Sequence, residues 1–332
     1  MPLLTVGIPI YNCEDFIQET LQNVFNELKT LEDPVEIVLC DNASTDNTQQ
    51  KILAAIQQIK PEIQTLNLPI DLGKGHVLKF FPNATNLGMD KNVFNCIKNA
   101  TGKFVHIHSA DDYYMQGGLK RLVECIKTHP DGTVICLSNA YLNTFNNQLI
   151  YCNATDDEDA HCKNLNEFIT HEQLKLLCLS NAVLRREDIL RLKSVQAGFG
   201  LVWMHLYLTQ QILQQDSTGY CFGFNHPVMV VRFGNQGWVK KGAIAYFYRA
   251  LCIYNDLRQK GLTKPQFNKL KKHFLNGVIN PQTQKSDRFF FNVVYALKYF
   301  PFYWPNIRQW LKFSGQLIFA PKQDFFHGMN NN

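Results

Sequence analysis

An α/β fold with a mainly parallel sheet flanked by helices is predicted by three features of this 332-residue sequence. Short apolar runs alternate with segments of helical periodicity through the first hundred residues. The hydrophobic content of 45% is ample for an ordinary globular core. Polar residues follow directly after several of the apolar runs. Alternating strands and helices are typical of βαβ crossovers, which give parallel strands with helices on both faces.

The first half of the chain supplies these elements in a regular order. Apolar runs predict strands at 3–10, 35–40, 76–83 and 103–109. Apolar residues at every third or fourth position predict helices at 14–31, 44–59 and 86–102. Ser44 and Thr45 open the second of these helices with side chains that favour helix starts, and Gly102 ends the third.

The second half is less regular. Its patterns predict a helix at about 115–129, two strands within 132–153 joined around Asn146 and Asn147, a strand leading into a helix at 180–187, a helix at 198–215 entered after Gly200, and a strand at 226–233. The acidic stretch 156–160 is expected to be an exposed loop. From residue 242 onward the pattern is helical, with basic residues among aromatic ones.

Charge is distributed unevenly along the chain, whose formal net charge is +5. Residues 236–332 hold 15 basic and three acidic residues, a net charge of +12, whereas residues 1–235 carry a net charge of −7. Phe, Tyr and Trp crowd beside the basic residues of 288–313, which favours an anionic membrane surface over nucleic acid as a partner. The alternative is a helical packing layer against the rest of the protein.

The N-terminus and the cysteines indicate the compartment. The first residues lack a basic segment followed by a long apolar one, so we predict no secretory signal. No run reaches the roughly 18 to 20 apolar residues that a bilayer span needs. Ten cysteines lie in apolar segments without CxxC pairs, which favours reduced, buried side chains over disulfides or zinc. We therefore expect a cytoplasmic protein, soluble or peripheral on the inner face of the plasma membrane.

Polar side chains directly follow three of the predicted strands. Asn12, Asp41 and Asp111 come just past the strands at 3–10, 35–40 and 103–109. Ligands of parallel α/β sheets bind beyond the carboxyl ends of the strands. The sequence therefore predicts that these three residues converge at one edge of the sheet.

Asp111 and Asp112 form an acid pair at the end of the fourth strand. Mg²⁺ and Mn²⁺ use one or two carboxylates together with phosphate oxygens and water. The pair therefore indicates a divalent metal site that is able to bind a diphosphate. The alternative for Asp112 is a cap on the helix predicted from about 115.

Asp41 and the segment "IPIYN" are candidates for nucleoside contacts. The Asp41 carboxylate is suited to accept hydrogen bonds from a nucleobase or a ribose hydroxyl, and the alternative is a turn acid, with Asp46 capping the next helix. Pro9 is expected to shape the turn after the first strand. The ring of Tyr11 is suited to stacking on a base, although a single tyrosine more often serves packing.

Together these segments resemble the inverting GT-A glycosyltransferases of family 2, which use nucleotide-sugars. The resemblance rests on "TVGIPIYN", "VEIVLCDNASTDNT", "NLG" at 86–88 and "ATGKFVHIHSADD". It is strong over about 3–125 and looser to about 235. It implies a Rossmann-like GT-A catalytic domain at 1–235, with a nucleotide-binding half at about 1–112 and an acceptor half at about 113–235. Residues 236–332 then form a helical C-terminal region, for which membrane association is one interpretation.

The resemblance also implies roles for individual residues. Asp41 falls on the nucleotide-binding acid, and the metal motif Asp-x-Asp-Asp falls on residues 109–112, where Ser109 replaces the first acid. A hydroxyl is able to bond a ribose but is a poor metal ligand, which leaves Asp111 as the ligand of Mg²⁺ or Mn²⁺ and Asp112 as its support. The implied nucleotide-sugar site comprises Pro9, Tyr11, Asn12, Asp41, Asn86, Ser109 and Asp112.

Two departures from the family pattern point to an abequosyltransferase-like branch. The usual Ala-Arg-Asn triplet is absent, and "NLGMDKNVFN" looks like the Asn-x-Gly-x-Asp-x-Asn form of that branch. The family's Glu-Asp general base falls on "GFGLVWMHLYL", which contains no acid. His205 has a suitable pKa there, so it is predicted as the base or as an acceptor contact. A buried histidine of an apolar helix is the alternative, and Glu187 and Asp188 are further candidates for the base.

The resemblance predicts a hexosyltransferase-type enzyme. It would move a sugar from a nucleoside-diphosphate sugar, UDP-linked by default, to a saccharide or lipid-linked acceptor in lipopolysaccharide, O-antigen or capsule assembly. A nucleotidyltransferase is one alternative, although "IPIYNCEDF" lacks the Gly-rich phosphate loop expected of it. A degenerate sugar-nucleotide binding module is another, and the missing acids favour it slightly.

Overall fold

The computed structural model divides the chain into a first compact unit, Met1–Phe233, and a second one, Gly234–Asn332. The catalytic and membrane-associating roles predicted for these two regions stay predictions. The described residues are 1–67, 69–144, 147–151, 160–162, 167–168, 172, 175–215, 221–233, 243–258, 263–265, 267–268, 271, 297–298, 311 and 314.

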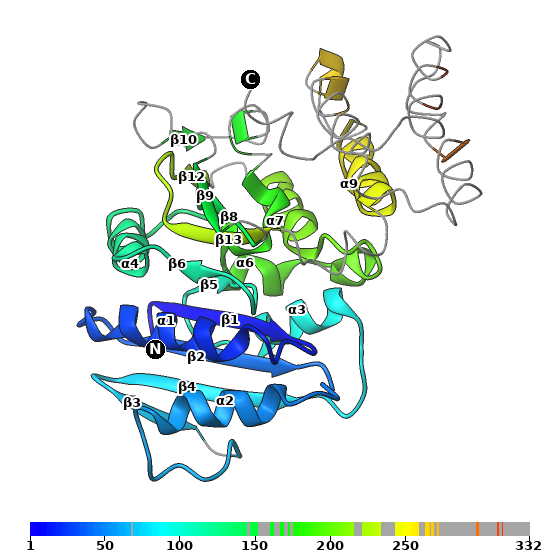
Figure 1. The fold of residues 1–332 in the computed structure, drawn as a ribbon. Coiled ribbons are helices and arrows are strands. Elements are labelled where there is room, and N and C mark those ends of the chain that lie inside the picture. The colour runs from blue at the N-terminus through cyan, green and yellow to red at the C-terminus, as the bar shows by residue number, and fades with distance from the viewer. Residues whose placement is uncertain are drawn as a thin grey trace. The chain divides into compact units, whose positions relative to one another are not determined.

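The first unit is built around a large sheet with the strand order β10-β12-β7-β11-β5-β1-β2-β4-β3 (Figure 1). At its centre β1 lies parallel to both β2 and β5, and β2 lies parallel to β4. This confirms the predicted α/β class and the four strands predicted in the first half of the chain. The strands are β1 (Leu4–Ile10), β2 (Val35–Asp41), β3 (Ile70–Gly73), β4 (His76–Pro82), β5 (Phe104–Ile107), β7 (Val134–Cys136), β10 (Ala160–Cys162), β11 (Ala182–Arg185) and β12 (Cys221–Gly223).

The flanks of this sheet are antiparallel as well as parallel, so the sheet is mixed rather than mainly parallel. β3 runs antiparallel to β4, and β11 runs antiparallel to both β5 and β7. β12 is parallel to β7, and β10 is antiparallel to β12. Sequence reasoning missed β3, β10 and β12, which have only three or four residues each and were not recognised from their local pattern.

A second sheet has the order β6-β13-β8-β9, with β6 (Tyr113–Tyr114), β8 (Asn139–Asn143), β9 (Gln148–Tyr151) and β13 (Met229–Phe233). The hairpin predicted around Asn146 and Asn147 is β8–β9. The prediction of only two strands within 132–153 is wrong, because β7 precedes this hairpin and belongs to the large sheet. The chain crosses between the sheets at Ser138, whose carbonyl accepts hydrogen bonds from the N–H groups of Val228 and Met229.

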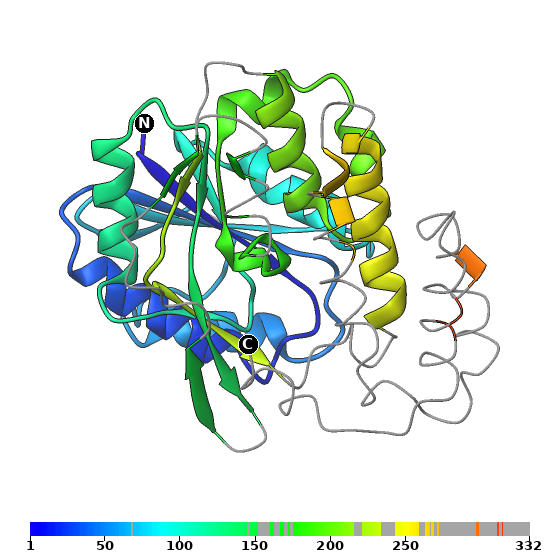
Figure 2. The same ribbon diagram turned by 90° about the horizontal axis from the view of Figure 1, so that it is seen from above.

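Helices cover both faces of the central strands. Side chains of α1, α2 and α4 belong to the same apolar cluster as Ile37 and Leu39 of β2, whereas Cys96 of α3 packs with Val38 and Cys40. Alternate residues of a strand point to opposite faces, so α3 lies across the sheet from the other three helices. Figure 2 shows α4 and α7 on opposite sides of the strands. The helices are α1 (Ile17–Lys29), α2 (Thr48–Gln57), α3 (Met89–Asn99), α4 (Gly118–Thr128), α6 (Arg186–Arg191) and α7 (Met204–Gln215).

The second unit contains helix α9 (Ala243–Arg258), in which Leu251 and Tyr254 are buried. This agrees with the helical pattern predicted from 242. The acidic stretch up to residue 159 and most of the basic and aromatic stretch 288–313 lie outside the described residues. In the part of the chain that is described, no helix has the length and apolar character needed to span a bilayer.

Candidate functional site

The carboxyl ends of β1, β2 and β5 place the predicted polar residues at one edge of the sheet. Ile10 pairs with Asp41, and Gly7 pairs with Ile107, so the segments that follow these three strands leave the sheet side by side. The Thr20 hydroxyl of α1 donates a hydrogen bond to the Ala110 carbonyl at 2.9 Å. The convergence of Asn12, Asp41 and Asp111 at one edge is therefore observed.

Asn12 and Asp41 tie the first two of these segments together. The Asp41 Oδ1 atom accepts hydrogen bonds from the Ser44 N–H at 3.2 Å and the Ser44 hydroxyl at 2.5 Å, and its Oδ2 accepts one from the Gln49 amide at 2.7 Å. Asn12 donates its backbone N–H to the Ser44 Oγ at 2.9 Å and accepts from the Thr45 N–H at 2.8 Å. Asp41 therefore stabilises the turn after β2, which was the alternative role considered for it. Its contact with a nucleotide stays a prediction.

Pro9 and Tyr11 occupy different environments. Pro9 lies within β1, paired with Cys40, so the prediction that it shapes the following turn is wrong. The pairing of β1 with β5 ends at Gly7, which lets the strand accommodate a residue without an N–H group. The Tyr11 residue is 48% exposed. A ring so exposed at this edge is accessible for stacking on a base.

Asparagines build the loop between β4 and α3. Asn86 Oδ1 accepts hydrogen bonds from the Asn42 amide and the Gly88 N–H, both at 2.9 Å. The Asn92 amide donates to the Cys40 carbonyl at 2.9 Å and to the Ile10 carbonyl at 3.3 Å. Asn86 therefore orders this loop against the segment after β2, and Asn92 holds the carboxyl ends of β1 and β2 together.

Asp90, between these asparagines, fixes the start of α7. Its Oδ2 atom accepts hydrogen bonds from the N–H groups of Gly200 and Val202 at 2.8 Å, and its Oδ1 accepts one from Met204 at 3.2 Å. Gly200 and Val202 have φ values of 89° and 66°, and the second is unfavourable for a β-branched residue. The helix predicted at 198–215 begins only at Met204, because the buried carboxylate holds the preceding loop in a non-helical conformation.

We expect Asp90→Asn to destabilise the protein by about 1–3 kcal/mol, because the amide nitrogen would face backbone N–H groups that need an acceptor. Urea unfolding measures the loss, and the fluorescence of Trp203 reports on the loop itself. Asp71→Asn is the matched control. Asp71 accepts one hydrogen bond, from the Gly73 N–H at 2.8 Å at an exposed position of β3, so its change should stay within about 0.5 kcal/mol. Equal losses in the two variants would contradict the role given to Asp90.

The two acids of the pair have different surroundings. Asp112 is buried, and it accepts hydrogen bonds from the Ser180 hydroxyl at 2.6 Å and from the Arg232 N–H at 3.1 Å. Burial and the charge of Asp111 raise the pKa of the Asp112 carboxyl well above its ordinary value. Asp111 is partly exposed, and its Oδ1 accepts a hydrogen bond from the Ser109 hydroxyl. Asp112 is therefore placed to support the loop, and Asp111 to meet a ligand.

The alternative that Asp112 caps the following helix is wrong. α4 begins at Gly118, with Gly117 as its N-cap residue. The Glu27 carboxylate of α1 accepts hydrogen bonds from the Gly117 N–H at 2.9 Å and from the Leu119 N–H at 3.2 Å. Glu27 of α1 therefore caps the start of α4, the role that was considered for Asp112.

Two buried histidines lie behind the acid pair. The His106 Nε2–H group donates to the Ser180 carbonyl at 2.7 Å, and its Nδ1 accepts from the Tyr114 hydroxyl at 2.5 Å. Burial lowers the pKa of His106 to about 3 and that of His108 to about 4, so both rings are neutral. Ser180 in turn bonds both Asp112 and the Ser109 N–H, at 2.6 Å and 2.9 Å. His106 therefore helps to hold the serine that positions residues 109–112, and His108 Nδ1 lies 2.7 Å from the Ser109 carbonyl oxygen.

The donor set fits a magnesium or manganese ion that takes most of its ligands from a substrate. Burial raises the pKa of the Asp111 carboxyl, and a bound cation would offset the cost of keeping it ionised. Among the described residues, no group of three or more His, Cys, Asp or Glu side chains is arranged to hold a metal ion. One carboxylate, supplemented by phosphate oxygens and water, is a common arrangement for Mg²⁺.

His205 is buried within α7, as its alternative interpretation predicted. Its Nε2–H donates to the Leu176 carbonyl at 2.8 Å, which leaves the lone pair on Nδ1. Burial lowers its pKa to about 4. No contact found within the described part of the chain joins His205 to the acid pair, so its role as the base stays a prediction.

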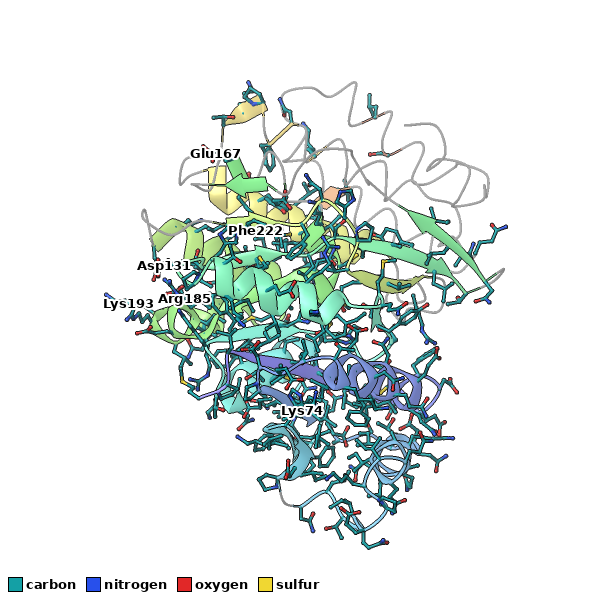
Figure 3. The ribbon with its side chains drawn as sticks, turned by 90° about the vertical axis from the view of Figure 1, so that its left-hand side faces the viewer. Lys74, Asp131, Glu167, Arg185, Lys193 and Phe222 are labelled. Carbon is teal, nitrogen blue, oxygen red and sulfur yellow. The ribbon has the colours of Figure 1, made fainter. Side chains whose placement is uncertain are left out.

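The other two candidates for the base, Glu187 and Asp188 of α6, each form an ion pair. Asp188 pairs with Arg185, at 2.6 Å from Nε, and Glu187 pairs with Arg191. Figure 3 shows Arg185 next to Asp131, whose carbonyl accepts a hydrogen bond from Arg185 at 3.2 Å. These local partners account for both acids without a catalytic role.

Sequence reasoning missed Arg232 of β13. Its guanidinium carbon lies 5.3 Å from the centre of the Phe16 ring and 5.5 Å from that of Tyr113. An Nη2 atom lies 2.5 Å from a Glu19 carboxylate oxygen. The sequence does contain a signal for this residue, because Arg232 comes directly after the apolar run "VMVV".

Comparison with known proteins gives a family match and a similar protein. The family described as "Glycosyl transferase family 2" matches residues 5–191. The abequosyltransferase RfbV of Salmonella typhimurium is 22% identical over 295 residues, which cover 82% of this chain and 79% of that protein.

Two solved structures share the fold. S. aureus TarS in complex with UDP-GlcNAc has a TM-score of 0.56 at 16% identity, covering 96% of this chain and 81% of that one. The mannosyltransferase PcManGT from Pyrobaculum calidifontis, in complex with GDP-Man and Mn²⁺, has a TM-score of 0.57 at 16% identity, covering 96% of this chain and 86% of that one. These likenesses confirm the predicted GT-A fold.

Proposed function

The chain belongs to glycosyl transferase family 2, and from that premise we propose that it moves a sugar from a nucleoside-diphosphate sugar to a saccharide or lipid-linked acceptor during cell-surface glycan assembly. The observation that carries the proposal is the sheet edge at which Asp41 and Asp111 converge, with Asp112 buried behind. Such an edge is where α/β sheets bind nucleotides.

The named relatives support the choice of donor and cofactor. One similar protein is an abequosyltransferase, and the two similar structures hold UDP-GlcNAc and GDP-Man, the second with Mn²⁺. We extend a nucleotide-sugar donor, UDP-linked by default, and a divalent ion, Mg²⁺ or Mn²⁺, to this chain. A cytoplasmic location with the region 236–332 on an anionic membrane surface belongs to the same proposal, which includes no nucleic-acid partner.

The proposed reaction is a single inverting displacement. The acceptor hydroxyl attacks the anomeric carbon opposite the leaving diphosphate. When bound, the divalent ion supplies positive charge that stabilises this leaving group. Asp111 would hold the ion, and Asp112 and Ser109 would orient Asp111. Asp41, Asn12 and Tyr11 would bind the nucleoside, and the Nδ1 atom of His205 is the proton acceptor that we propose.

A thermal-shift panel of UDP-, GDP-, CDP- and dTDP-sugars with Mn²⁺ tests the donor. A ligand that binds only the folded protein adds about 2.7 kcal/mol of stability at one hundred times its Kd, so at least one donor should raise Tm clearly. The free sugars, without a nucleotide, are the control. The proposal is wrong if none of the four donors stabilises the protein.

The family match and a release assay separate the alternatives. The family match favours glycosyl transfer over nucleotidyl transfer. A degenerate binding module would also be stabilised by a donor. It would not release the nucleoside diphosphate over time, and release is therefore measured on the donor that gives the largest shift.

A further inference from the structure

Arg232 is a cation enclosed beside the acid pair. Its side chain is 12% exposed, and its backbone N–H donates to Asp112 Oδ1 at 3.1 Å. Val230 of the same strand pairs with Tyr113, the residue after the acids. The strand that carries Arg232 therefore runs directly alongside the segment at which the acids stand.

Two aromatic rings fix the guanidinium group. Its carbon lies 5.3 Å from the ring centre of Phe16, just before α1, and 5.5 Å from that of Tyr113. Aromatic contacts use the flat faces of a guanidinium group, whereas its N–H donors lie along the edges. Those edges match the geometry of phosphate oxygens, to which arginine donates two parallel hydrogen bonds.

The site has fewer acids than the family pattern, which makes a positively charged side chain useful for binding a diphosphate. Ser109 stands where the family has an acid, so one carboxylate, Asp111, is left to hold a cation at this edge. The guanidinium group of Arg232 lies against the ring of Tyr113, the residue directly after the acids, and the Arg232 backbone is bonded to Asp112. Arg232 therefore stands beside the place where a diphosphate would meet Asp111.

We propose that Arg232 contacts the diphosphate of the nucleotide-sugar and stabilises the charge that collects on it during transfer. This inference rests on the proposed function. The bond between the anomeric carbon and the phosphate oxygen breaks, and its electron pair goes to that oxygen. The bond from the acceptor oxygen to the anomeric carbon forms, and the acceptor proton goes to the base. Arg232 stays protonated throughout and supplies only hydrogen bonds and charge.

Glu19 is one group that a diphosphate would have to replace at Arg232. The two side chains form an ion pair at 2.5 Å, but the Glu19 side chain is 64% exposed. Ion pairs that face solvent contribute little, and a diphosphate carries more charge than a carboxylate. The arginine is therefore able to exchange this partner for the diphosphate.

The test compares a nucleoside with its diphosphate, uridine and UDP being the first pair. The affinity of the full-length protein for each is measured with EDTA and with Mn²⁺, for wild type, Arg232→Gln, Arg232→Lys and Glu19→Gln. With EDTA, Arg232→Gln should lose about tenfold or more of its affinity for UDP and keep its affinity for uridine. Arg232→Lys should lose less, and Glu19→Gln should bind UDP at least as well as wild type.

The outcomes separate the possible failures. Equal losses for uridine and UDP, or no loss for either, would mean that Arg232 only links β13 to α1, and would overturn the inference. Melting temperatures without ligand show whether each variant is folded. If Arg232→Gln does not fold, the affinities of Arg232→Lys for uridine and UDP decide the test. If the wild type binds no nucleoside diphosphate with any base, the proposed function itself fails and takes this inference with it.

Discussion

Asp111→Asn is expected to slow the release of nucleoside diphosphate from the donor by at least about 100-fold, the scale of losing one electrostatic contact to a transition state. The amide keeps the size of the side chain but loses the charge that would hold the divalent ion next to the leaving group. The hydrogen bond from Ser109 needs only an oxygen, which the amide retains. The fold should therefore survive. The measurement is the release rate at saturating Mn²⁺, with the melting temperature recorded alongside.

Two further variants make this result specific. Ser109→Ala removes the hydroxyl that bonds Asp111 and keeps the carboxylate, so its loss of rate should stay below about tenfold. Asp112→Asn should act on stability, because the new amide would meet donors from Ser180 and Arg232 at both oxygen positions. An unchanged release rate in Asp111→Asn would contradict the metal assignment.

The centre of the fold was predictable because its signals are local. β1, β2, β4 and α1 each show their own periodicity in a continuous stretch of sequence. By contrast, β6 has two residues, and its pairing partner β13 lies more than a hundred positions away in the chain. No window of sequence contains both strands. Short strands of this kind depend on their tertiary partners, and sequence patterns do not show them.

The candidate site was likewise predictable where its signals are local and not where they depend on distant residues. The rule on strand ends located Asp41 and Asp111, because that rule needs only the strands before them. The difference between Asp111 and Asp112 depends on Ser180 and Arg232, which are 68 and 120 positions away from Asp112. Asp90 likewise acts on residues more than a hundred positions later. Sequence reasoning identified the polar residues of the site and could not identify their partners.

Glu36→Ala is expected to destabilise the protein by about 3–5 kcal/mol, because it leaves several hydrogen-bond donors unpaired and removes the partner of the partly buried Lys79. Glu36 is 2% exposed near the amino end of β2. Its oxygens accept hydrogen bonds from the Thr5 hydroxyl and Lys79 at 2.6 Å and from the Thr101 N–H at 2.6 Å. This carboxylate therefore joins β1, β2, β4 and the segment before β5. Urea unfolding at pH 7 measures the loss.

The pH dependence of stability separates the contribution of the Glu36 charge from that of the size and shape of its side chain. Burial acts to raise the pKa of Glu36, but the hydrogen bonds from Lys79, Thr5 and Thr101 outweigh it and leave the pKa below the ordinary 4.5. A carboxyl whose pKa is lowered by folding stabilises the protein above its unfolded pKa, and this contribution is lost as the pH falls through the folded pKa. The stability gap between wild type and Glu36→Gln should therefore be widest at neutral pH and shrink below pH 4.5.

A matched control comes from another glutamate paired with a lysine. Glu32 bonds Lys74 at 2.7 Å, but its side chain is 84% exposed. Glu32→Gln should change stability by less than about 1 kcal/mol, because exposed ion pairs contribute little. A gap for Glu36→Gln that stays constant from pH 7 to pH 3.5, or one no larger than that of Glu32→Gln, would show that the amino edge of the sheet does not depend on this charge.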